Sequence, residues 1–370
     1  MRVRDEKDIA GCAIAGIMSE AGRRYCGENV VRSVAVMKER SNGLGGGFAA
    51  YGIYPEYAGK YAFHLMLDHA QAHEAARDYL VLNCTIAHEE TIPTRPTEAI
   101  GSSPILHRYF VEPRPQLRER YYDETEEDII VRAAMHINRS IDGAFVMSCG
   151  KNMGVFKGVG QPEDIAHFFR LEEYEAYLWL AHGRFPTNTT GWWGGSHPFG
   201  LLDWSVVHNG EVSSYGINRR YLQNFGYYCA LRTDTEVICY LLDLLIRKHA
   251  LPVDLACQVL APPFWSQIAR MAPAEQELAR ALRVVYGGAL LNGPFSIVVG
   301  HSGGLIALND RTKLRPMTAA RKGEMLYIAS EEAAIWEVCD SPDRLWHAQA
   351  GVPIIGALQE KSLAQVARTA

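Results

Sequence analysis

The sequence predicts an α+β fold built on mainly antiparallel sheets, and three observations lead to that prediction. Apolar or alternating segments of strand length recur from residue 12 to residue 330. Turn residues interrupt two of these segments, at residues 144–160 and 295–310, in the pattern of β-hairpins. The amphipathic helical segments do not follow the strands one by one, as they do in a doubly wound parallel sheet.

The first elements follow from short apolar runs and from glycines. Residues 12–18 predict a buried strand, residues 28–39 a helix with one apolar face, and residues 48–54 a second strand. The glycines between residues 43 and 47 disfavour a helix there. Because no Gly-Lys-Ser/Thr follows them, we favour a tight turn or close backbone packing over a phosphate-binding loop.

The rest of the chain changes unevenly between helices and strands. Residues 88–125 are polar and rich in proline, which indicates an inserted surface excursion. Further helices are predicted at residues 126–140, 163–171, 235–249, 274–285 and 331–338, and further strands at residues 177–185, 204–212 and 325–330. Thr233 or Asp234 is the natural N-cap of the long helix that follows them.

The composition is typical of a globular protein and excludes several classes of function. Of the 370 residues, 48% are hydrophobic and 21% are charged. The net charge of −5 gives no sign of a basic surface for nucleic acid. The chain has no run of 18 apolar residues, and its charged N-terminus lacks the apolar segment of a secretion signal. We therefore expect a cytoplasmic protein that binds neither nucleic acid nor membrane.

The eight cysteines do not form a pattern that binds a metal or an iron–sulfur cluster. None belongs to a Cys-x-x-Cys pair, and without a secretion signal we expect no disulfides. We interpret seven of them as mostly buried thiols. Cys12 is the exception, because it begins the first apolar strand and a thiolate is a strong nucleophile. If cleavage after Gly11 frees its α-amine, that amine, with a pKa near ~8, can act as a base.

Four residues with binding chemistry stand at the ends of predicted elements, where functional sites are usually built. Arg184 and Asp234 can hold the carboxylate and the ammonium group of one α-amino acid. The side-chain N–H of Asn209 and a backbone N–H at Gly210 can form an oxyanion hole. Taken singly, each residue has an ordinary reading as a salt bridge, a hairpin turn or a helix cap. Their combination, in this order and spacing, favours a functional site.

Three motifs give the chain a resemblance to a known family. Residues 11–18 read GCAIAGIM, residues 182–189 read HGRFPTNT, and VHNGEV at 207–212 is followed by RTDTEV at 232–237. These motifs resemble those of the class II glutamine amidotransferases, which are N-terminal nucleophile hydrolases. HGRFPTNT is most similar to the glutaminase part of glutamate synthases, in particular the separate amidotransferase subunit of archaeal-type multi-subunit glutamate synthases.

The resemblance implies a four-layer αββα sandwich of two mainly antiparallel sheets. It implies a candidate propeptide at residues 1–11 and a single type 2 amidotransferase domain at residues 12–370, with an insertion at about 55–140. Activity would then require self-cleavage between Gly11 and Cys12. Ala13 departs from the glycine that the family prefers at that position.

The resemblance also implies a role for each candidate residue. Cys12 would attack the side-chain amide of L-glutamine to give L-glutamate and ammonia, with its own α-amine as the base. The other implied roles are an oxyanion hole from Asn209 and Gly210, substrate binding by Arg184, Phe185, Thr187 and Asp234, and orienting support from His197 and His208. Trp192 and Trp193 lie on the loop between the strands predicted at residues 177–185 and 204–212. For them we favour packing against neighbours over a lid that closes on substrate.

The resemblance places other components on other chains. Ammonia would pass to a glutamate synthase-type partner, so FMN and iron–sulfur clusters are expected on partner chains, with no cofactor and no metal on this one. Three alternatives remain. The chain could be an uncleaved, catalytically silent subunit that binds glutamine or serves as a scaffold. It could act on a different amide, although Arg184 and Asp234 argue against that. It could serve a phosphoribosyl- or sugar-phosphate-transferring enzyme, which would need a separate synthase chain.

Overall fold

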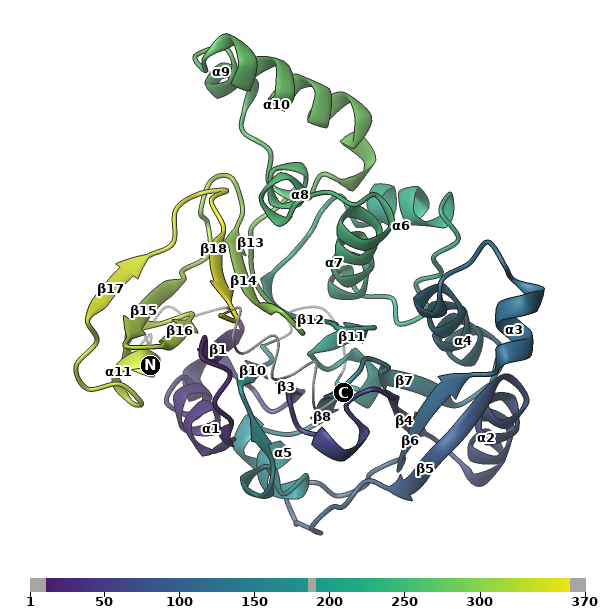
Figure 1. Ribbon diagram of the computed structural model, residues 1–370. Helices are drawn as coiled ribbons and strands as arrows, with labels where there is room; N and C mark the ends of the chain where they lie inside the picture. Colours follow the sequence, from purple (N-terminus) through teal and green to yellow (C-terminus); the bar gives the residue numbers. More distant parts are fainter. Residues whose placement is uncertain (1–10, 186–190, 360–370) are drawn as a thin grey trace, which may run out of the picture.

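Two stacked antiparallel sheets form the centre of the molecule (Figure 1). The computed structural model describes residues 11–185 and 191–359, without the side chains of residues 118 and 120. The larger sheet contains, in spatial order, β17 (Arg344–His347), β15 (Thr318–Lys322), β16 (Met325–Ala329), β1 (Ala13–Ser19), β10 (Leu178–Gly183), β3 (Gly46–Tyr51) and β8 (Met153–Gly158). The smaller sheet contains β11 (Phe199–Leu201), β12 (Trp204–Gly210), β13 (Phe295–His301), β14 (Gly304–Asn309) and β18 (Ile354–Ala357).

Gly16 of β1 allows the two sheets to approach each other closely. A Cβ atom at this position would lie 2.9 Å from Leu305 Cδ1 and 3.1 Å from Val298 Cγ1, which belong to the smaller sheet. Both contacts are tighter than ordinary van der Waals packing, so a larger residue would push the sheets apart.

Helices cover the outer faces of both sheets, which completes the four layers. The larger sheet is covered by α1 (Glu28–Ala35), α5 (Pro162–Phe168) and α11 (Glu332–Trp336). The smaller sheet is covered by α7 (Asp234–Leu242), with α6 (Tyr215–Gln223) and α8 (Val253–Leu260) beside it. The predicted α+β fold with an αββα sandwich is therefore confirmed. No helix in the described ranges combines the length and the apolar character needed to cross a membrane.

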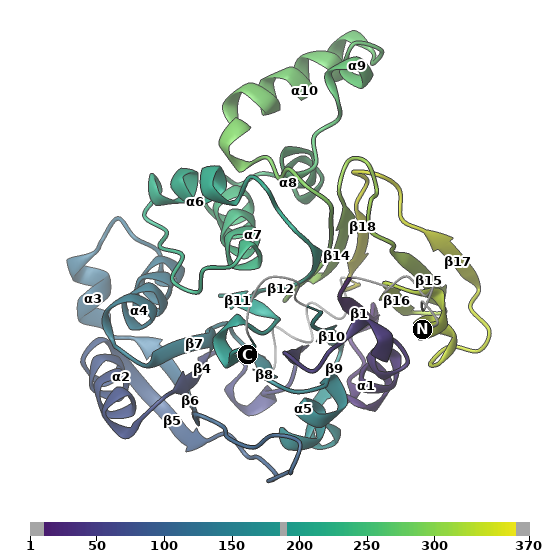
Figure 2. The same ribbon diagram turned by 180° about the vertical axis from the view of Figure 1, so that it is seen from behind.

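A third antiparallel sheet lies beside the sandwich (Figure 1 and, from behind, Figure 2). Its strands, in spatial order, are β5 (Cys84–Thr91), β6 (Ile105–Pro113), β4 (Tyr61–Leu67) and β7 (Ala144–Ser148). The helices α2 (Ala70–Asn83) and α4 (Glu126–Ser140) pack on it, and α3 (Pro115–Arg120) follows β6. The capping box of Thr125 and Asp128 starts α4 at the predicted residue.

The prediction of a surface excursion at residues 88–125 is wrong. β6 crosses this segment as an inner strand of the third sheet, and Tyr109, Phe110 and Val111 are almost fully buried. The strand was missed because consecutive buried residues do not alternate with polar ones. Proline and charged residues on both sides of it dominate the composition of the segment.

The prediction of a hairpin across residues 144–160 is also wrong, although both of its strands exist. β7 pairs with β4 in the third sheet, whereas β8 pairs with β3 in the larger sheet. The turn between them, with Asn152 at a φ of +51°, passes the chain from one sheet to the other. The hairpin predicted at residues 295–310 is confirmed, since β13 pairs with β14.

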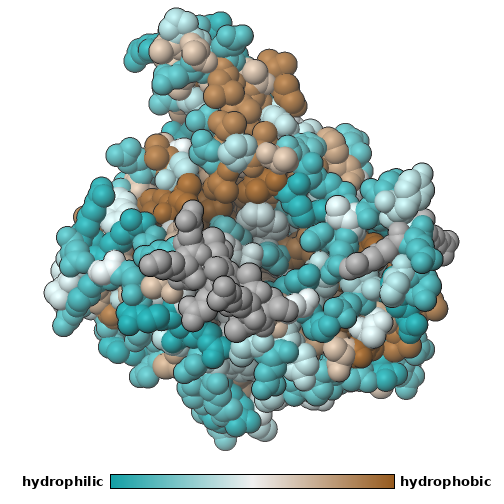
Figure 3. Space-filling model, viewed as in Figure 1, coloured by the Kyte–Doolittle hydropathy of each residue, from teal (hydrophilic) through white to brown (hydrophobic). Residues whose placement is uncertain are grey.

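A helical arm projects from the body at the top of Figure 1. It contains α9 (Trp265–Ile268) and α10 (Pro273–Val285) and follows α8. Apolar residues gather on the surface where the arm meets the body (Figure 3), and α10 exposes Leu278, Val284 and Val285. A two-stranded ribbon of β2 (Tyr25–Cys26) and β9 (Glu175–Ala176) completes the strands of the described chain.

Candidate active site

Cys12 lies directly before β1, the strand that pairs with β10 on one side and β16 on the other. Its Sγ accepts a hydrogen bond from the backbone N–H of Phe185 at 3.4 Å. Its own backbone N–H donates to Asn209 Oδ1 at 3.2 Å. The residue is half-buried and lines a cavity of about 260 Å³. The candidate nucleophile therefore faces a small cavity.

Strand pairing brings Arg184 and the oxyanion candidates to the same cavity. Because Ala13 pairs with Gly183, the end of β10 delivers Arg184 beside Cys12. β12 ends in Asn209 and Gly210, and both line the cavity. The Nδ2 of Asn209 is buried and has no hydrogen-bond partner in the described ranges. A buried donor without a partner is rare in folded proteins, so this N–H is open to a ligand.

Gly210 is the residue type that its place requires. Its φ is +151°, and a Cβ atom there would collide with the carbonyl oxygen of Pro294. An L-residue with a side chain would therefore displace β12 from β13. The glycine keeps the backbone of the oxyanion candidate against the cavity.

Asp234 is the first residue of α7 and lines the same cavity. Thr233 caps the helix, since its hydroxyl accepts from the N–H of Glu236 at 3.1 Å. The Oδ2 of Asp234 accepts from the N–H of Val212 at 2.9 Å, and Oδ1 lies 3.6 Å from His208 Nδ1. Burial acts to raise the pKa of Asp234, but His208 and the backbone hydrogen bonds outweigh it and lower the pKa below its usual value. The carboxylate is therefore ionised and able to hold a cation.

The electrostatics of Cys12 oppose early ionisation of the thiol. Burial raises its pKa most, and the Asp234 carboxylate raises it further. The Phe185 N–H and the guanidinium groups of Arg184 and Arg315 act in the other direction without reversing the shift. The thiol needs a base to become a nucleophile at neutral pH.

His197 and His208 meet at a residue that the sequence prediction did not include. The hydroxyl oxygen of Thr235 lies 2.7 Å from His197 Nε2 and 3.1 Å from His208 Nδ1. A third histidine, His182 of β10, stacks on His197 with ring centroids 4.0 Å apart. Burial lowers the pKa of His182 to about 3 and the pKa of His197 well below its usual value, so both rings are neutral. The position of Thr235, one residue after Asp234 in RTDTE, was the available signal.

The remaining predicted residues have mixed outcomes. Phe185 lines the cavity and supplies its backbone N–H to Cys12. Thr187 lies outside the described residues. Trp192 packs edge-on against Phe145 and Trp193 against Phe168, with centroid distances of 5.5 Å and 5.9 Å. The tryptophans therefore contact neighbours, as favoured.

The glycines between residues 43 and 47 allow β3 to pack closely against the segment that contains Ser196 and His197. A Cβ atom at Gly47 would collide with the carbonyl oxygen of His197. A Cβ atom at Gly45 would lie 2.6 Å from Ser196 Oγ. The prediction of close backbone packing is confirmed, and this packing holds the segment of His197 against β3.

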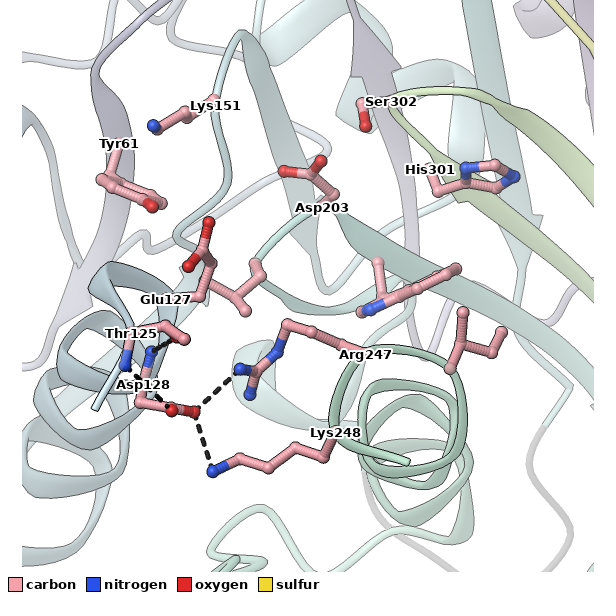
Figure 4. Close-up of a pocket in the computed structure, with 13 residues that line it drawn as sticks. Tyr61, Thr125, Glu127, Asp128, Lys151, Asp203, Arg247, Lys248, His301 and Ser302 are labelled. Carbon is pink, nitrogen blue, oxygen red and sulfur yellow. Dashed lines mark hydrogen bonds and ion pairs between the residues drawn. The ribbon is translucent and has the colours of Figure 1, made fainter. Parts of the chain in front are cut away.

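A larger cavity of about 590 Å³ lies at the other end of β12 (Figure 4). There, Arg247 and Lys248 both pair with Asp128, each at 2.8 Å. None of the residues predicted to do chemistry lines this cavity. The candidate nucleophile Cys12, the oxyanion candidates, Arg184 and Asp234 all line the smaller cavity, which is therefore the candidate active site. In the described ranges, no three His, Cys, Asp or Glu residues gather as a metal site.

Comparisons with known proteins identify the family of this chain. A family model described as "Glutamine amidotransferases class-II" matches residues 86–344, which include the Arg184, Asn209, Gly210 and Asp234 positions. An uncharacterized protein of Archaeoglobus fulgidus is 48% identical over 98% of this chain and 97% of its own length. A protein of Methanothermobacter thermautotrophicus named "Putative glutamine amidotransferase" is 24% identical over 90% of this chain and 95% of its own length.

Among solved structures, glutamine phosphoribosylpyrophosphate amidotransferase from B. subtilis matches 94% of this chain with a TM-score of 0.46 and 13% identity. The chain spans 50% of that enzyme. The family match covers more than half of the present chain, and its range contains every residue that lines the candidate active site except Gly11 and Cys12. The chain therefore belongs to the class-II glutamine amidotransferases.

Proposed function

We propose that this chain hydrolyses L-glutamine to L-glutamate and ammonia, with Cys12 as the nucleophile. One observation carries the proposal: Cys12, Arg184, Asp234 and the open Nδ2 of Asn209 line the same cavity of about 260 Å³. A cavity of this size suits a single amino acid better than a large amide.

The two charged groups match the ends of the substrate. The guanidinium of Arg184 pairs with the α-carboxylate, and the carboxylate of Asp234 pairs with the α-ammonium group. Phe185 and Thr187 line the remainder of the binding site in this proposal. An amide without an α-amino acid end offers no matching charge to Arg184 or to Asp234, which disfavours the alternative substrates.

Hydrolysis then proceeds through a covalent intermediate. The Cys12 thiolate attacks the side-chain amide carbon, and the oxyanion accepts hydrogen bonds from Asn209 Nδ2 and the backbone N–H of Gly210. The α-amine of Cys12 takes the thiol proton and passes it to the leaving nitrogen, which departs as ammonia. Water next cleaves the glutamyl thioester and releases L-glutamate.

This chemistry requires removal of residues 1–11. In the described chain the nitrogen of Cys12 is an amide joined to Gly11 and donates to Asn209. An amide nitrogen is not a base. Gly11 has a φ of +144°, and a Cβ atom there would lie 3.2 Å from both Arg40 Nη1 and Asn209 Oδ1. The conformation and the crowding both favour glycine before the proposed cleavage point.

We further propose that residues 12–370 form one amidotransferase domain that delivers ammonia to a glutamate synthase-type partner. The similarity of HGRFPTNT to the glutaminase part of glutamate synthases supports this assignment. FMN and iron–sulfur clusters would then belong to partner chains. The third sheet, which accounts for most of the proposed insertion at about 55–140, offers a surface outside the sandwich for such a partner. Absorbance of flavin and clusters in a complex purified through this chain would support the partner, and a colourless complex would contradict it.

The second candidate function is an uncleaved, catalytically silent subunit. The nitrogen of Cys12 favours it, because this nitrogen is an amide joined to Gly11 that donates to Asn209 and cannot act as the base. The two functions differ in the mass of the protein from its native host. A mass lower by residues 1–11 supports the glutaminase, and a full-length mass in the assembled complex supports the silent subunit.

Activity of the processed protein gives the decisive test. Cys12→Ala should abolish glutamate release, because no other group can form the thioester. Cys26→Ala is the matched control, since Cys26 is the other half-buried cysteine and does not line the cavity. Retained glutamate release in Cys12→Ala would overturn the proposal.

A further inference from the structure

Thr235 stands at the meeting point of two histidines and the Asp234 carboxylate. The side chain is fully buried at the start of α7. Its Oγ1 lies 2.7 Å from His197 Nε2, 3.1 Å from His208 Nδ1 and 3.4 Å from Asp234 Oδ1. A hydroxyl has one hydrogen to donate and two lone pairs that accept. Three polar neighbours therefore match its full hydrogen-bonding capacity.

The chemistry of the neighbours fixes the direction of each bond. An ionised carboxylate only accepts, so the hydrogen of Thr235 goes to Asp234. Both ring nitrogens that face Thr235 must then carry hydrogens and donate to its oxygen. The Nδ1 of His208 also lies 3.6 Å from Asp234 Oδ1, where a hydrogen on Nδ1 is electrostatically favourable.

The nitrogens on the far sides of the rings give an independent check. His182 Nε2 lies 3.1 Å from the carbonyl oxygen of His208, which only accepts, so His182 carries its hydrogen there. The buried atoms His182 Nδ1, His197 Nδ1 and His208 Nε2 have no hydrogen-bond partner in the described ranges. In neutral rings with the assignment above, all three atoms are lone pairs. No buried N–H of these histidines is left without an acceptor, which is the less costly arrangement.

We propose that Thr235 is a positioning residue, which collects the N–H groups of His197 and His208 and donates its own hydrogen to Asp234. The network holds the carboxylate in one orientation, with Oδ2 on the N–H of Val212 and the remaining lone pairs toward the cavity. The effect on catalysis rests on the proposed role of Asp234 in glutamine binding. The assignment of the hydrogen bonds does not depend on that role.

The first test reads the ring hydrogens directly and requires no activity. Protein labelled with ¹⁵N-histidine is measured by long-range ¹H–¹⁵N NMR, with His182→Gln, His197→Gln and His208→Gln used only to assign the signals. The expected result is hydrogens on Nε2 of His182, Nε2 of His197 and Nδ1 of His208, with the His182 and His197 rings neutral. A hydrogen on Nδ1 of His197, or no hydrogen on Nδ1 of His208, would overturn the proposal.

The second test uses the kinetics of the processed protein. Thr235→Val keeps the shape and removes the hydroxyl, so KM for glutamine should rise about tenfold while kcat changes less than about threefold. Thr235→Ser restores the hydroxyl and should restore KM. The matched control is Thr318→Val on β15. It removes another buried hydroxyl that contacts a histidine, since Thr318 Oγ1 lies 3.1 Å from His347 Nδ1. Its KM should stay at the wild-type value.

The pH profile separates positioning from a general loss of structure. The charged or titratable groups around Asp234 are His208 on β12, Arg184 after β10 and the Cys12 thiol before β1. Because the hydroxyl of Thr235 donates to Asp234 Oδ1 at 3.4 Å and so favours the ionised carboxylate, its removal should move the acid limb of kcat/KM to higher pH. An unmoved limb in Thr235→Val, or no recovery in Thr235→Ser, would refute the positioning role. If the processed wild type releases no glutamate, the proposed function fails, and the NMR result still decides the assignment for Thr235.

Discussion

The open amide of Asn209 makes a sharp prediction about the variant Asn209→Asp. The wild-type side chain uses Oδ1 to accept from the Cys12 nitrogen at 3.2 Å and leaves Nδ2 without a partner in the described ranges. Aspartate has nearly the same shape and keeps an oxygen for the Cys12 nitrogen. It replaces the donor that the proposed oxyanion needs with a second oxygen, and in its ionised form it also places a negative charge beside the oxyanion.

The expected loss follows from the burial of this side chain. Removal of one oxyanion donor costs about 10² to 10³ in kcat, or about 2.7–4 kcal/mol of transition-state stabilisation. The side chain of Asn209 is 0% exposed, so water has little access to replace the lost donor, and we expect the upper part of this range. KM should change little, because the contact strengthens only as charge develops on the oxygen.

The assay is steady-state glutamate release by the processed protein, with the thermal midpoint measured in parallel. Asn138→Asp is the matched control, since Asn138 on α4 also uses Oδ1 to accept a backbone N–H, from Val146 at 2.7 Å, and lies outside the cavity. Its kcat should equal that of the wild type. A decrease of less than about fivefold in kcat for a folded Asn209→Asp would refute the assignment of Nδ2 to the oxyanion hole.

Two further predictions concern stability. Gly47→Ala should lower the thermal midpoint and the activity together, because the added methyl group meets the carbonyl oxygen of His197; a wild-type melting curve would contradict this reading. Asp128→Asn should lower stability in urea at neutral pH. Burial acts to raise the pKa of Asp128, but Lys248 and Arg247 lower it from 3.8 to about 2. The stabilisation is therefore complete above about pH 4 and disappears toward pH 2, where the midpoints of variant and wild type should converge. A constant difference between them across this range would rule out the ion pairs as its source.

The parts of the site that the sequence predicted are those set by local signals. Arg184, Asn209 and Asp234 stand where predicted strands end or a helix begins, and the cap at Thr233 marks that beginning within one residue. The glycines beside these element ends, such as Gly210, fit positions whose backbone conformation favours glycine. This is why the candidate nucleophile, the oxyanion residues and the charged pair were all found before any contact was known.

The parts that were missed depend on contacts between distant segments. Thr235 follows Asp234 directly in the chain, but its contact with His197, and the stacking of His182 on His197, arise only because distant segments meet in the fold. The same limit explains the false hairpin, in which the turn at Asn152 is locally sound. There, β4 and β3 provide better partners for the two strands than the strands provide for each other.

The place of Cys12 in the larger sheet has a consequence for local motion. Chain ends normally fray, and a catalytic group on a frayed end must be ordered again in each reaction cycle. Here the residues that follow Cys12 form a fully buried strand with partners on both sides. Amide hydrogens in such a strand exchange slowly, at rates close to those of global unfolding. An amine created at Cys12 would thus begin in a rigid part of the molecule, and its alignment with the thiol would add little entropy cost to each turnover.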